Sequence, residues 1–126
     1  MPVTLTLEAD GRILRVVYAD PWSIEEMLAA FEDTGRYLDA ATKPIHLLVD
    51  VTRVVRPTLG ALRAREAPIL HHPMGGDIAV FGANSLARAI AETVMRLARF
   101  KRAHFFASEA EALAYLNNLI AQETTA

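Results

Sequence analysis

The stretch Lys43-Pro44-Ile45-His46-Leu47-Leu48-Val49-Asp50 decides the fold of this chain. Its nearly continuous run of branched apolar residues is typical of a central parallel strand, because both faces of such a strand are covered and polar residues need not alternate with apolar ones. The strand is expected to end at Asp50, at the carboxyl edge of the sheet. Open α/β sheets meet ligands and partners at that edge, so the segment from Asp50 to Thr58 is the first candidate for a functional site.

Toward the N-terminus, the sequence predicts a β-hairpin followed by a helix. Apolar residues alternate with polar ones over 3–8, and a second apolar run follows over 13–18 after a turn that contains glycine. Ser23 and Glu26 have the three-residue spacing of a capping box, which predicts that a helix begins here and runs to about Ala41.

Toward the C-terminus, the sequence predicts further helices that alternate with two buried strands. Thr58 is expected to cap a short helix, with Leu59 facing inward, that weakens before Pro68 because the residue before a proline disfavours helical geometry. The strands are expected over 77–82 and 103–106, and a last helix follows them. The helix between these two strands has an expected core stripe of Leu86, Ile90, Val94 and Leu97.

The predicted order of elements is ββαβαβαβα, which indicates an α/β fold with a mixed, mostly parallel sheet of about five strands. At 126 residues, with 52% hydrophobic and 22% charged residues, the chain is expected to form a single domain over 1–126. Its hydrophobic core is expected to be large enough to need no disulfide or structural metal. The absence of cysteine excludes disulfides and thiolate chemistry and favours an intracellular protein. Neither a leader segment nor a membrane-spanning run is recognisable, so a cytoplasmic location without membrane insertion is expected.

With this order of elements, the chain resembles the SpoIIAA-like superfamily. That superfamily includes bacterial anti-sigma-factor antagonists and STAS domains, and its fold is close to that of CRAL-TRIO lipid-binding domains. The terminal Ser108-Glu109-Ala110-Glu111-Ala112-Leu113-Ala114-Tyr115-Leu116 is similar to the ending of an uncharacterised STAS-like group. The resemblance implies a SpoIIAA-like fold and a non-catalytic regulatory or protein-interaction domain.

The resemblance also singles out Thr58. Anti-sigma-factor antagonists carry a phosphorylatable serine at a helix start, after an acidic residue and before a small residue and a glycine. Thr58 occupies the similar place, but Pro57 stands where the acid is expected and Leu59 separates Thr58 from Gly60. Thr58 is therefore a candidate phosphoacceptor, and the alternative is an ordinary threonine that caps a helix.

Around Thr58, the sequence predicts a binding loop. Asp50 could act as a general base if burial raised its pKa, although capping of the loop is the simpler role for one acid without a paired nucleophile. Arg53 and Arg56 are close enough in sequence to attract a phosphate. The candidate binding loop comprises Asp50, Thr52, Arg53, Arg56, Thr58 and Leu59.

The sequence carries few other signals of chemistry. The adjacent His71 and His72 would point in opposite directions on an extended loop, and His46 and His104 are expected to be structural, so no metal site is predicted. No cofactor motif or catalytic set is recognisable, and the chain is expected to be neither an enzyme nor dependent on a cofactor. Basic residues at 96–102 have little aromatic interleaving in a chain of net charge −2, which argues against nucleic acid.

Two functions follow as hypotheses. The leading one is a STAS-like regulatory domain, possibly similar to anti-sigma-factor antagonists, with an unknown protein partner. The alternative is a binding domain for a small apolar ligand or lipid, with a pocket beneath Val54, Val55 and Leu59.

A homodimer is also predicted. The apolar hairpin edge and Trp22 could both contribute to an interface between two copies. Trp22 could instead fold back onto Met27 as a hydrophobic staple.

Overall fold

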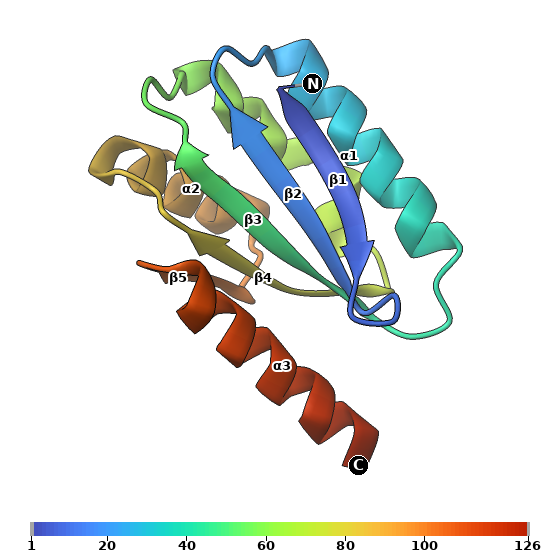
Figure 1. The fold of residues 1–126 in the computed structure, drawn as a ribbon. Coiled ribbons are helices and arrows are strands. Elements are labelled where there is room, and N and C mark those ends of the chain that lie inside the picture. The colour runs from blue at the N-terminus through green and yellow to red at the C-terminus, as the bar shows by residue number, and fades with distance from the viewer. Residues whose placement is uncertain (1, 126) are drawn as a thin grey trace.

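The computed structural model describes residues 2–125, and its five strands form one sheet in the order β1-β2-β3-β4-β5 (Figure 1). β1 is antiparallel to β2, and the other neighbours are parallel, which confirms an α/β fold with a mixed, mostly parallel sheet. The strands are β1 Val3–Glu8, β2 Ile13–Ala19, β3 Ile45–Arg53, β4 Gly75–Phe81 and β5 Ala103–Phe106. The helices are α1 Ile24–Asp39, α2 Ser85–Ala98 and α3 Glu109–Thr125, with two 3₁₀ helices, η1 Leu59–Glu66 and η2 Pro68–His71.

The strand order explains how the helices are divided between the two faces of the sheet. From β2 to β5 each parallel strand is added on the same side of the previous one, so right-handed crossovers place α1, η1, η2 and α2 on one face. α3 follows the last strand and is free to cover the opposite face, as Figure 1 shows. Alternation along β2 divides its side chains accordingly: Leu14 and Val16 belong to the core under α1, whereas Ile13 belongs to the core under α3.

Local sequence accounts for the helix starts. The capping box of α1 is present as predicted: the Glu26 backbone N–H donates to Ser23 Oγ at 3.1 Å, and the Ser23 N–H donates to Glu26 Oε1 at 2.9 Å. At α2, Asn84 Oδ1 accepts from the Ala87 N–H at 2.8 Å. The predicted stripe of α2 is partly wrong, because Leu86 and Leu97 are each 55% exposed. Ile90, Val94 and Ala98 form its buried face.

The segment after β3 differs most from expectation. β3 continues past Asp50 to Arg53, because Arg53 still pairs with Ala19 of β2. The predicted short α-helix is instead η1 followed by η2. Thr58 does cap η1, with Thr58 Oγ1 accepting from the Gly60 N–H at 3.2 Å, but Leu59 is 69% exposed rather than inward.

Candidate ligand pocket

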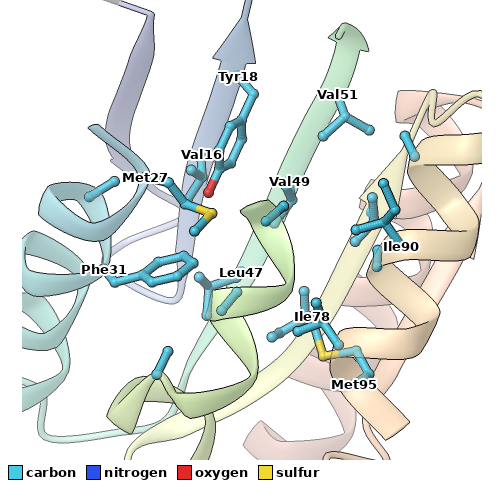
Figure 2. A pocket seen from close by; sticks show the side chains of 18 of the residues that line it. Val16, Tyr18, Met27, Phe31, Leu47, Val49, Val51, Ile78, Ile90 and Met95 are labelled. Atoms are coloured by element: carbon cyan, nitrogen blue, oxygen red, sulfur yellow. The ribbon is translucent and has the colours of Figure 1, made fainter. Parts of the chain in front are cut away.

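A cavity of about 170 Å³ lies between the sheet and the helices that cover its first face (Figure 2). The sheet contributes Val16, Tyr18, Leu47, Val49, Val51, Ile78 and Val80, and α1 contributes Met27, Ala30, Phe31 and Thr34. The remaining walls come from η1, η2 and α2, from Trp22 before α1, from the segment between β3 and η1, and from Ala67 between η1 and η2. Each helix that covers this face of the sheet therefore borders the cavity, which makes the cavity the candidate functional site.

The cavity exists because small residues face it. A 3₁₀ helix has three residues per turn, so Ala61, Ala64 and Ala67 share one face of this segment, and all three line the cavity. Ala87 and Ala91 occupy equivalent positions on α2, at the four-residue spacing of an α-helix. The same three-residue period explains why Leu59 is exposed, since it lies off the alanine face. The run of alanines with period three predicts a face of small side chains, but only the packing of the other elements around that face makes it the wall of a cavity.

The lining is almost entirely apolar. None of the described residues that line the cavity is charged, and only Tyr18, Trp22 and Thr34 bring polar side-chain atoms to it. Thr34 Oγ1 donates to the Ala30 carbonyl oxygen at 2.8 Å. The rings of Tyr18 and Trp22 meet edge to face, with centroids 5.3 Å apart. Burial raises the pKa of the Tyr18 phenol, so this side chain stays neutral at physiological pH.

The predicted binding loop is tied down by two carboxylates. Asp50 Oδ1 accepts from the Thr52 N–H at 2.9 Å and from Thr52 Oγ1 at 2.7 Å, so Asp50 has the capping role rather than that of a free base. Asp20 Oδ2 accepts from the N–H groups of Val55 and Arg56 at 2.7 and 3.2 Å. These bonds hold the loop in one conformation beside the cavity.

Only part of this loop reaches the cavity. Val54 is buried and lines the cavity together with Pro57, whereas Val55 is 71% exposed. The prediction of a pocket beneath Val54, Val55 and Leu59 is thus right for Val54 and wrong for the other two. The structure brings Asp50 and Thr52 together, but none of the six predicted site residues lines the cavity, and five of them are exposed, namely Thr52, Arg53, Arg56, Thr58 and Leu59.

His46 ties α3 to the opposite face of the sheet. His46 is 2% exposed, and its Nδ1 accepts from the Asp77 N–H at 2.8 Å, so Nε2 carries the hydrogen and donates to Glu123 Oε1 at 3.0 Å. Arg12 pairs with the other oxygen of the same carboxylate. The predicted structural role of His46 is confirmed. Within residues 2–125, no group of three potential ligand side chains could hold a metal ion.

A second polar cluster was not predicted from the sequence. Tyr115 of α3 donates to Asp77 Oδ2 at 2.7 Å and lies 2.8 Å from His104 Nε2, which is 3.1 Å from the same Asp77 oxygen. Burial and the hydrogen bond to Asp77 raise the pKa of Tyr115 to about 12. The three residues come from β4, β5 and α3, so the cluster ties α3 to the sheet, and spacing along the chain carries no signal of it.

Comparison with known proteins finds no matching family model and no curated protein with significant sequence similarity. The described part of the chain has no helix with the length and apolar character needed to cross a membrane.

Proposed function

We propose that this protein binds a small, neutral, apolar molecule in the cavity between the sheet and its first helical layer. The observation that carries this proposal is the cavity itself, with about 170 Å³ and no charged residue among its described lining. An engineered apolar cavity of about 150 Å³ stays dry and binds benzene, which sets the scale of a fitting molecule. Pockets for drug-sized ligands have volumes of about 300–1,000 Å³, so the molecule that fits this cavity is smaller than a typical drug.

Binding rather than catalysis fits the chemistry of the lining. Close-packed interiors rarely contain voids larger than a water molecule, and a void deprives its lining of dispersion contacts. An apolar guest restores these contacts and buries its own surface from water. The described lining has no acid–base pair and no nucleophile with an adjacent base. Hydrolysis and proton transfer at this site would need such groups.

The test is a cavity-filling variant with a matched control on the same helix. Ala91→Leu places a larger side chain in the cavity, whereas Ala89→Leu makes the same change on the exposed face of α2. We expect toluene to shift the methyl NMR signals of cavity residues in the unmodified protein and in Ala89→Leu. Ala91→Leu should weaken toluene binding at least tenfold and raise the free energy of unfolding by about 0.5–2 kcal/mol.

Equal toluene affinity in both variants would contradict the proposal, as would an unmodified protein that does not bind toluene at all. Native mass spectrometry after mild purification gives an independent check. A co-purifying small molecule that is lost in Ala91→Leu and kept in Ala89→Leu would identify the physiological ligand.

A second proposal, a STAS-like regulatory function through a protein partner, draws support from the loop after β3. Val55 and Leu59 expose 71% and 69% of their surface on a segment that Asp20 holds in place. Neighbouring exposed apolar side chains are a common feature of protein interfaces. If this loop binds a partner, Val55→Ser with Leu59→Ser abolishes a stable complex in pull-downs from the source cell, without changing toluene affinity. Unchanged capture would contradict the proposal.

Self-association remains a proposal as well. β1 is an edge strand, and Leu7 on it is 42% exposed, whereas Val3 is buried and Leu5 half-buried, so Leu7 is the apolar side chain of this strand that a second copy could best contact. Trp22 is half-buried against Tyr18 and lines the cavity, so we propose the β1 edge rather than Trp22 as the contact. Sedimentation equilibrium should give a dimer that Leu7→Lys converts to the 13.8 kDa monomer. A monomeric unmodified protein would contradict this.

A further inference from the structure

Tyr18 and Trp22 are the two lining side chains whose polar atom makes no hydrogen bond within the described residues, and Tyr18 is the more deeply buried of the two. Tyr18 is 9% exposed, and within residues 2–125 its oxygen makes no hydrogen bond. Figure 2 shows the ring extending from β2 into the pocket with the hydroxyl oxygen at its inner end. Buried polar groups are almost always hydrogen-bonded, so an unpaired hydroxyl at this depth requires an explanation.

The other polar side chains of the described interior differ from Tyr18 in this respect. Every polar side-chain atom that is sealed from solvent in residues 2–124 has a hydrogen-bond partner. The Tyr18 oxygen is therefore not sealed, and the space that it faces is the cavity. Thr34, the other hydroxyl of the lining, already donates to Ala30. The structure thus presents one hydroxyl to the cavity that can bind a guest without losing a bond to the protein.

We propose that the ligand carries one neutral oxygen, a ketone or a hydroxyl, on an otherwise hydrocarbon body, and that this oxygen forms a hydrogen bond with the Tyr18 hydroxyl. This inference rests on the proposed function, and it adds the chemical class of the ligand and the residue that selects it. The cavity volume limits the body to about one ring with short substituents, near the size of the benzene-binding cavity. The cavity is too small to enclose a long acyl chain.

The absence of charged residues from the described lining argues against an ionised ligand. A carboxylate or an ammonium group inside would be buried without an opposite charge, because none of the described lining residues carries one, and burial of an unpaired charge is costly. Because burial raises the pKa of Tyr18, its phenol also stays neutral and can donate a hydrogen bond. A single neutral hydrogen bond then fixes the orientation of the guest, while the apolar walls supply affinity.

The test uses three probes of nearly equal size. Acetophenone carries a carbonyl, α-methylstyrene replaces that carbonyl oxygen with a methylene group, and benzoate is ionised. Dissociation constants are measured by NMR titration for the unmodified protein and for Tyr18→Phe, which removes only the hydroxyl. We expect Tyr18→Phe to weaken acetophenone binding by about 3- to 10-fold and to leave α-methylstyrene binding unchanged, in keeping with the net value of one hydrogen bond. Benzoate should bind neither protein.

The possible failures are distinguishable. If acetophenone and α-methylstyrene bind the unmodified protein but change by the same factor in Tyr18→Phe, the proposed hydrogen bond is wrong and the apolar pocket stands. Tight binding of benzoate would overturn the neutral class. If neither neutral probe binds the unmodified protein, both the inference and the proposed function are wrong. A melting curve of Tyr18→Phe, followed by circular dichroism, confirms that the variant is folded before its affinities are compared.

Discussion

The two faces of the sheet are built from the same strands but are packed in opposite ways. Under α3, the side chains of Leu48, Ala79, Phe81 and Leu116 are at most 3% exposed and form a continuous core. Under α1, η1, η2 and α2, the side chains surround a cavity of about 170 Å³. The strands therefore do not create the hollow, and the elements that cover them do.

The difference lies in the covering segments. α3 presents Ala112 and Leu116, four residues apart, to strand side chains that close around them. The connection from β3 to β4 instead contains two 3₁₀ helices: η1 turns Ala61 and Ala64 toward the cavity, and η2 contributes Ile69 and Leu70. The small inward residues of η1 leave space that an α-helix with leucines would fill.

Adjacent leucines in β3 offer the largest effect with which to test this contrast. Leu48 faces α3 and is 0% exposed, whereas Leu47 faces the cavity. Leu48→Ala should lower the free energy of unfolding by about 3–5 kcal/mol, because tight packing leaves an unfilled void. Leu47→Ala should cost about 1 kcal/mol less, because part of this side chain already lacks neighbours. Urea unfolding followed by circular dichroism measures both, and equal losses would contradict the comparison.

The polar anchor of α3 should give a medium effect. Glu123 accepts from buried His46 and from Arg12, so Glu123→Ala leaves a buried N–H without its partner. The expected loss is about 1–3 kcal/mol in the free energy of unfolding. Glu109→Ala is the control on the same helix, since Glu109 pairs with Arg15 at a side chain that is 50% exposed, and its loss should stay below about 1 kcal/mol. A larger loss in the control would show that α3 is not anchored at Glu123.

The tyrosines of the two faces predict a smaller, pH-dependent effect. Burial raises the folded-state pKa of Tyr18 above the unfolded value of about 10, so the unfolded state loses its proton first as the pH rises. The contribution of Tyr18 to the free energy of unfolding should therefore be constant below about pH 10. Above that pH it should fall by at most about 1.4 kcal/mol per pH unit.

Tyr18→Phe should remove this part of the alkaline fall. Tyr115→Phe should remove a similar part up to pH 11.5, because burial and the hydrogen bond to Asp77 raise the pKa of Tyr115 to about 12. Urea unfolding at pH 9, 10, 11 and 11.5 measures the alkaline loss of stability in both variants. An undiminished alkaline loss in Tyr18→Phe would show that the phenol facing the cavity is well hydrated in the folded protein.

Periodicity made much of this fold predictable. The alternation over 3–8, the capping box at Ser23 and the apolar run before Asp50 each depend on residues close in sequence, and the structure has the corresponding hairpin, helix and central strand. The site was less predictable. The loop from Asp50 to Thr58 lies beside the cavity, but most of its side chains are exposed, and the cavity is lined instead by apolar residues, alanines and a tyrosine among them, that form no chemical motif.

By itself, the sequence determined the order of elements, the caps of the helices and the buried character of β3, because these follow from local hydrogen bonding and from the period of apolar residues. Only the tertiary structure decided that Ala61, Ala64 and Ala67 face the same space as Tyr18, and that Tyr115, Asp77 and His104 meet. The physical reason is that a cavity, or an unpaired hydroxyl inside it, is a property of how separate elements pack. No segment of the chain carries it alone.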